Sequence, residues 1–161
     1  MTGIVITAYG TPAPQGSKRA FAVRGKGGVP TGRVAVIESS HDRVKSWRQA
    51  VIDAALDADW LQLAGPLSVA VVFALPRPKS HYRTGRNAGQ LRDSAPEWPS
   101  GAPDLDKLLR STMDGLTAAG LWADDAQVVE YSRLAKTYAG SGPLAVPGAV
   151  ITVLTTTTTE E

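Results

Sequence analysis

The chain has 161 residues, of which 43% are hydrophobic and 20% charged, with a net charge of +2 and no cysteine. This size and composition suit one soluble, compact domain with a buried core, and the lack of cysteine excludes disulfides, thiolate nucleophiles and cysteine-ligated zinc. The sequence contains no apolar run of the roughly 18–20 residues that span a membrane and no signal peptide, so we expect a cytoplasmic protein without a membrane partner.

In the first part of the chain, the pattern of apolar residues predicts two strands and one helix. Residues 4–9 alternate well enough for a first strand, and the Gly- and Pro-rich stretch 11–32 is expected to be a long loop. A short apolar strand over 33–38 follows. The helix over about 40–59 has an apolar stripe at helical spacing and is capped by one of the two serines at its start.

In the second part of the chain, the residue pattern predicts a central strand, a long loop and a second helix. Residues 67–75 are almost continuously apolar and β-branched, which is typical of a strand covered on both faces. Residues 76–102 lack periodicity, and an irregular stretch of that length is usually functional or disordered. A helix over 106–119 ends at a glycine. Two further strands are predicted, near 128–138 and over 149–154.

These elements predict an α/β fold in a single compact domain over 1–154, followed by a polar tail over 155–161. The domain is expected to contain a mixed β-sheet of about five strands and two main helices. The sequence shows no internal repeat and no linker that would divide it.

Carboxylates flank the second predicted helix. Asp104 and Asp106 are two residues apart, so in extended chain they point the same way. Asp125 follows the helix, and a chain that doubles back after Gly120 can bring it toward the other two. Clustered carboxylates raise each other's pKa values unless a cation binds them. Because Mg²⁺ is held by a few carboxylates with water and phosphate oxygens, the pattern indicates a metal site for a phosphate-containing substrate.

Other interpretations of the same aspartates remain open. Asp is favoured at helix caps and in turns, which needs no metal. The Asp-x-Asp pattern also occurs in aspartyl phosphatases and glycosyltransferases. However, residues 97–103 cannot be the buried strand that precedes the phosphatase motif, and glycosyltransferases need a nucleotide-binding half that this chain lacks. A non-catalytic DNA-binding module is a further alternative.

Basic residues gather on both sides of the acidic centre. Five lie within 77–92 and five within 18–33, with no acidic residue in either stretch. Such flanks suit a polyanion held by its backbone while metal ions act on one phosphate. The same residues are equally suited to solvating exposed loops.

Three blocks of the sequence resemble the RusA family of Holliday junction resolvases, which is common in bacteria and their phages. The first block is the loop over 10–19, which contains proline and lysine, and the second is 73–81, at the end of the predicted central strand. The third block, PDLDKLLR at 103–110, is the specific one, and it continues through 113–116 and 122–128.

The resemblance implies a RusA-like fold and a homodimeric endonuclease that binds four-way DNA junctions and cuts paired strands symmetrically. It implies Mg²⁺ as cofactor, for which Mn²⁺ can substitute. On the family pattern, Asp104, Asp106 and Asp125 are the metal-binding acids. The chain departs from that pattern at two positions, since the family usually has Asn at Lys107 and Lys at Arg110. Arginine can stabilise phosphate charge but does not give up a proton.

Neighbouring residues are assigned supporting roles. If the second helix begins near Asp106, then Arg110 and Asp114 lie close to one face of it, and Arg110 reaches the scissile phosphate. Asp114 either supports the site or forms an exposed ion pair with Arg110. Asp124 is either a partner that supports the metal-binding acids or a turn residue, and we favour the turn role. The candidates for phosphate contacts, which position DNA without reading its sequence, are Lys18, Arg19, Arg77, Lys79 and His81.

Overall fold

The computed structural model describes residues 2–16, 18–38 and 41–156. Four strands form one mixed sheet in the order β1-β6-β4-β5. The strands are β1 (Gly3–Tyr9), β4 (Leu67–Leu75), β5 (Val128–Tyr138) and β6 (Gly148–Thr155). Strand β6 runs antiparallel to both β1 and β4, whereas β5 runs parallel to β4.

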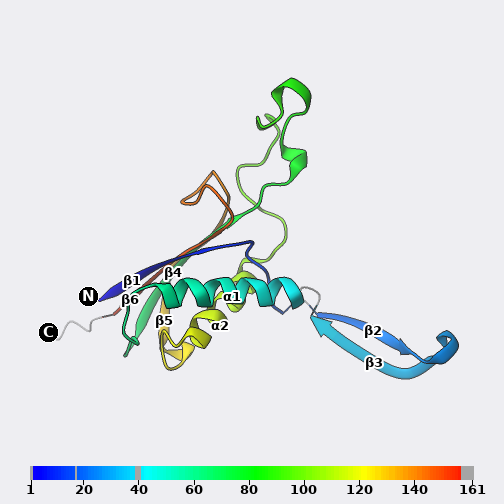
Figure 1. The fold of residues 1–161 in the computed structure, drawn as a ribbon, viewed down its shortest axis with the longest axis horizontal. Helices are drawn as coiled ribbons and strands as arrows, with labels where there is room; N and C mark the ends of the chain where they lie inside the picture. Colours follow the sequence, from blue (N-terminus) through cyan, green and yellow to red (C-terminus); the bar gives the residue numbers. More distant parts are fainter. Residues whose placement is uncertain (1, 17, 39–40, 157–161) are drawn as a thin grey trace.

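Two helices lie on one side of this sheet, α1 (His41–Asp57) and α2 (Leu105–Ala119) (Figure 1). Helix α1 buries Val44, Trp47, Val51 and Ala55, which recur at helical spacing. The helices pack against each other, and the indole Nε1 of Trp47 donates a hydrogen bond of 3.0 Å to Thr112 Oγ1. This contact fixes the rotation of α2 and therefore the direction in which its polar face points.

The strand predicted at 67–75 is confirmed as β4, with the same bounds. It lies between β6 and β5, and seven of its nine residues are buried. Its apolar character follows from this position, because both faces of a central strand are covered. The predicted strands at 4–9, 128–138 and 149–154 are also confirmed, to within one residue at each end.

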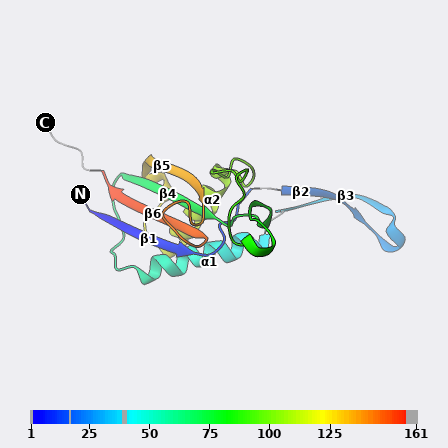
Figure 2. The ribbon, with the colours of Figure 1, turned by 90° about the horizontal axis from the view of Figure 1, so that it is seen from above.

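The prediction of a long loop over 11–32 is wrong for the second half of that range. That half contains strand β2 (Lys18–Arg24) and a turn, and β2 pairs antiparallel with β3 (Pro30–Glu38). The glycines and the proline that suggested a loop are concentrated in the turn between the strands. The two strands form a separate ribbon that extends away from the main sheet (Figures 1 and 2), so the sheet has four strands rather than five.

Smaller details also differ from the sequence predictions. The serines expected to cap α1 lie outside the described residues, as do residues 157–161 of the predicted tail. Thr155, which the sequence predicts to lie in the tail, belongs to β6. Over the described parts of the chain, none of the helices combines the length and the apolar character needed to cross a membrane.

Replacing Gly115 with alanine is expected to destabilise the packing of α1 on α2. A Cβ at this position would lie 3.0 Å from Val51 Cγ1 and 3.3 Å from the carbonyl oxygen of Arg48. Overpacking costs about 1–3 kcal/mol and a helical Gly→Ala change gains about 1 kcal/mol, so we expect a net loss of about 1 kcal/mol.

Urea denaturation measures this loss as a change in the free energy of unfolding. Gly101→Ala is the control, because no atom lies within 4 Å of the added Cβ. If Gly115→Ala were as stable as this control, the close approach of the two helices would be incorrect.

Candidate functional site

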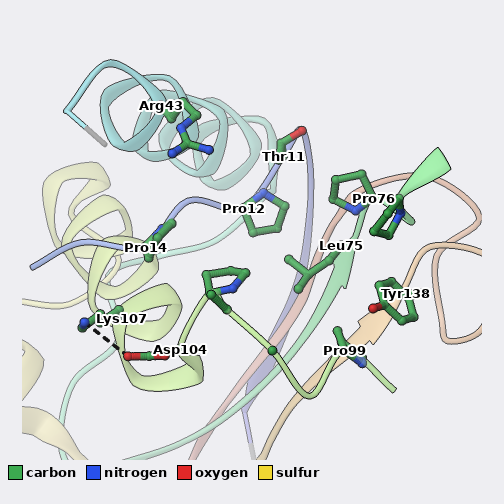
Figure 3. Close-up of a pocket in the computed structure, with 14 residues that line it drawn as sticks. Thr11, Pro12, Pro14, Arg43, Leu75, Pro76, Pro99, Asp104, Lys107 and Tyr138 are labelled. Carbon is green, nitrogen blue, oxygen red and sulfur yellow. Dashed lines mark ion pairs between the residues drawn. The ribbon is translucent and has the colours of Figure 1, made fainter. Parts of the chain in front are cut away.

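The three sequence blocks meet around one pocket at the N-terminus of α2 (Figure 3). The pocket has a volume of about 520 Å³. Its lining residues from the three blocks are Thr11, Pro12 and Pro14, then Leu75, Pro76 and Pro78, and finally Pro103, Asp104 and Lys107. Segments that are far apart in the sequence therefore share one concave surface, which is the usual form of a binding site.

The first block is fastened along α2 by three hydrogen bonds. Ser111 Oγ donates to the carbonyl oxygen of Ala13 at 2.6 Å, and the backbone N–H of Gln15 donates to the carbonyl oxygen of Lys107 at 3.0 Å. Gln15 Nε2 donates to Asp114 Oδ2 at 2.7 Å. The loop therefore follows the first turns of the helix and forms one wall of the pocket.

Asp104 occupies the N-cap position of α2, but its side chain does not cap the helix. The carboxylate forms an ion pair of 3.2 Å with Lys107 Nζ, and 59% of the side chain is exposed. Asp106 lies in the first turn of the helix and is exposed. The helix dipole favours negative charge at this end. Both carboxylates are therefore available for a ligand, and for Asp104 the capping alternative is wrong.

Asp125 lies at the opposite end of the domain from this pocket. It begins the short turn Asp125–Gln127, directly before β5. Strand β5 then runs parallel to β4 until Tyr138 is paired with Leu75, and these two residues line the pocket. The 15 residues of α2 also separate the two ends by about 22 Å.

The expectation that the chain returns Asp125 to Asp104 and Asp106 is therefore wrong for a single protomer. After α2 the chain pairs with Leu63, whose N–H donates to the carbonyl oxygen of Leu121 at 2.9 Å, and this pairing leads it away from the pocket. Within the described ranges, no group of three His, Cys, Asp or Glu side chains is placed to hold a metal ion.

Asp124 and Asp125 differ in their surroundings although they are adjacent. Asp124 forms a capping box with Gln127, and its Oδ1 accepts a hydrogen bond of 2.8 Å from the N–H of Ala126. This is the turn role favoured from the sequence. Asp125 is exposed, and the pKa of Tyr131 is raised first by burial and then by the negative charge of Asp125.

Arg110 is exposed on α2 and faces the first block. Its guanidinium lies so close to Gly16 that an added Cβ there would be 2.7 Å from Nη1. The possible ion pair between Arg110 and Asp114 does not form, because Asp114 accepts from Gln15 instead. The two ion pairs among the described residues are Lys107–Asp104 and Arg83–Asp93.

Arg77 anchors the long loop over 76–102. Its guanidinium carbon lies 4.1 Å from the centre of the Tyr138 ring, and Nη1 donates to the carbonyl oxygen of Pro96 at 2.7 Å. His81 packs edge-on against the same ring, with centroids 5.5 Å apart. Among Arg77, Lys79 and His81, only Lys79 is exposed, and the other two are half-buried. For the other candidate phosphate contacts, Lys18 is exposed, and the side chain of Arg19 lies outside the description.

Lys136 belongs to the site but was not identified from the sequence. Its Nζ donates to the carbonyl oxygens of Gly101 at 2.6 Å and Pro103 at 2.8 Å, and so it holds the segment that leads into Asp104. A lysine in a strand carries no signal for this role, because its partners are backbone groups more than 30 residues away. Beside this segment, Trp98 is 54% exposed.

Comparison with known proteins identifies similar chains. A family model described as "Endodeoxyribonuclease RusA" matches residues 11–147, which contain nearly all of the three blocks. A crossover junction endodeoxyribonuclease of Enterobacteria phage 82 and one of Escherichia coli K12 are each 61% identical to this chain over 28 residues. The matched stretch covers 17% of this chain. It covers only 23% of the length of each of these curated relatives.

Replacing Lys136 with methionine is expected to loosen the segment before Asp104. Hydrogen bonds to a charged donor contribute about 1.5–3 kcal/mol each, so local opening is expected to become at least about tenfold more frequent. Amide hydrogen exchange measures this at Ser100, whose N–H donates to the carbonyl oxygen of Trp98. Lys45→Met, on the exposed side of α1, is the control. Equal protection of Ser100 in both variants would show that Lys136 does not hold the segment.

Proposed function

The chain belongs to the RusA family of endodeoxyribonucleases, and from this membership we propose that it resolves four-way DNA junctions by hydrolysing phosphodiester bonds at the N-terminus of α2. The observation that carries the proposal is that the three blocks converge on one pocket beside Asp104, whose carboxylate does not cap the helix. The N-terminus of a helix attracts phosphate through its free N–H groups and its dipole.

Two cationic side chains support the binding of a phosphate here. Lys107 lines the pocket, and Arg110 lies one turn further along α2. The guanidinium of Arg110 is suited to stabilise negative charge on the phosphate oxygens. Lys107 carries an amine, and it is therefore the better suited of the two to donate a proton to the leaving oxygen when the P–O bond breaks.

The donor chemistry of Asp104 and Asp106 fits Mg²⁺, and Mn²⁺ as its substitute. A small hard cation is commonly held by one or two carboxylates, with water and phosphate oxygens completing its shell. Asp104 and Asp106 are exposed at the same helix end, and neither is used to cap the helix. When bound, the cation lowers the pKa of a coordinated water and offsets charge on the phosphate.

Asp125 can join these two carboxylates only from a second copy of the chain. We therefore propose a homodimer in which the Asp125 end of each protomer faces the α2 N-terminus of the other. A two-fold axis completes both sites at once, because each protomer supplies what the other lacks. Two equivalent sites match a four-way junction, in which two strands of like polarity are cut. In this arrangement dimerisation is required for catalysis as well as for symmetry.

Replacing Asp106 with asparagine is expected to abolish cleavage of synthetic four-way junctions in the presence of Mg²⁺. The amide is a weaker ligand for a hard cation, and the loss of several kcal/mol corresponds to at least about a 100-fold lower rate. Asp57→Asn, at the exposed end of α1, is the matched control. A linear duplex of equal length measures selectivity for branched DNA. Binding without cleavage by the unaltered protein under all metals would instead indicate a non-catalytic DNA-binding module.

Mixing two inactive variants tests whether Asp125 acts across the dimer. Asp106→Asn and Asp125→Asn homodimers are both expected to be inactive. In their heterodimer, one site receives both substitutions and the other receives neither, so nicking of one strand is expected to return. If all three acids came from one protomer, each site would carry one substitution and the heterodimer would be as inactive as its parents. Gel analysis of nicked products, after co-refolding differently tagged chains, distinguishes the two cases.

A further inference from the structure

The ribbon formed by β2 and β3 does not pair with any strand of the main sheet. The two strands pair only with each other, and both views show the ribbon projecting beyond the N-terminal end of α1 (Figures 1 and 2). An isolated two-stranded hairpin is only marginally stable in water. A ribbon of this length that lacks packing against its own domain is therefore a candidate for binding another molecule.

Both faces of the ribbon are open and carry small or apolar side chains. The cross-strand pair Ala22 and Val34 lies on one face, and Val34 is 67% exposed. The pair Phe21 and Ala35 lies on the other face, with Phe21 45% exposed. The alanines keep the ribbon thin, and exposed apolar faces of this kind mark interaction surfaces.

The charge of the ribbon identifies a polyanion as the partner. The ribbon, residues 18–38, contains five of the chain's 17 basic residues and one of its 15 acidic residues, Glu38, which lies at the inner end of β3. Arg24, Lys26 and Arg33 lie near the turn at the outer end, and all three are exposed. Cations at the outer end of a projecting arm attract a nucleic acid backbone rather than a neutral or basic protein surface.

The root of the ribbon lies beside the candidate active site. The N–H of Gln15 donates a hydrogen bond to the carbonyl oxygen of Lys107, and the guanidinium of Arg110 lies where a side chain on Gly16 would begin. DNA with a phosphate at the N-terminus of α2 therefore meets the ribbon where the ribbon begins. The nine residues of β3 extend about 30 Å, which corresponds to roughly nine base pairs of duplex.

We propose that the β2–β3 ribbon enters the major groove of the duplex arm that flanks the cut, with Lys26 and Arg33 on the phosphates. The major groove is about 12 Å wide and admits a two-stranded ribbon. The proposal rests on the proposed function and adds a specific contact to it. It makes affinity depend on the length of the arm as well as on the branch point.

The test compares junctions with long arms and junctions whose arms are cut to about five base pairs and closed by hairpin loops, shorter than the roughly nine base pairs that the ribbon spans. Binding is measured without divalent cations, so that no strand is cut. The variant is Lys26→Gln with Arg33→Gln, and the control with equal charge is Lys45→Gln with Arg133→Gln, both exposed and outside the ribbon.

The ribbon variant is expected to bind long-arm junctions about tenfold more weakly than the unaltered protein, with a salt slope lower by about 2. On short-arm junctions the two proteins are expected to bind equally. The control pair is expected to match the unaltered protein on both substrates.

Three results would overturn the proposal in distinguishable ways. Equal binding of the ribbon variant and the control to long arms would exclude the groove contact while leaving junction cleavage intact. Loss of the dimer in Val34→Thr with Val36→Thr, seen by sedimentation, together with unchanged DNA binding by the ribbon variant, would make the ribbon a protein–protein arm. No binding of any branched or linear DNA by the unaltered protein would refute the proposed function itself.

Discussion

The candidate site depends on the fixed position of the N-terminus of α2. Trp47 and Thr112 join α2 to α1, Ser111 joins it to the first loop through Ala13, and Lys136 ties the segment before it to β5. Each of these contacts comes from a different part of the chain, and together they leave the first turn of α2 no freedom to rotate. As a result, Asp104 remains beside the pocket although its side chain does not cap the helix and contacts it only through the ion pair with Lys107.

The length of the same helix imposes the second constraint. A helix of 15 residues holds its ends about 22 Å apart, and the pairing of Leu121 with Leu63 keeps the chain that follows it at the far end. Asp125 therefore cannot share an ion with Asp104 and Asp106 within one protomer. A symmetric dimer removes this restriction, because the far end of one protomer can meet the near end of another. In this account the protomer is half of an enzyme, and the pocket at Asp104 and the exposed Asp125 are its two complementary surfaces. The proposed contact of the ribbon with DNA would extend the same site along a duplex arm.

Much of this fold could be predicted from the sequence because its signals are local. The apolar run of β4 and the helical spacing in α2 give their elements nearly to the residue. The ribbon was missed since glycine and proline in its turn dominate the composition of the whole stretch. The place of Asp125 was missed because it depends on pairing with Leu63, 58 residues before Leu121. No pattern near Gly120 reveals that contact, and no pattern in one chain reveals a partner.

Each metal site is proposed to be formed by two protomers together. A crystal of the protein grown with Mn²⁺ tests this arrangement, because anomalous scattering locates the ion without reference to the surrounding atoms. We expect an anomalous peak bound by Asp104 and Asp106 of one protomer and by the partner's Asp125. A peak at Asp104 and Asp106 with every Asp125 remote from it, or no peak at the N-terminus of α2, would refute a site shared between protomers.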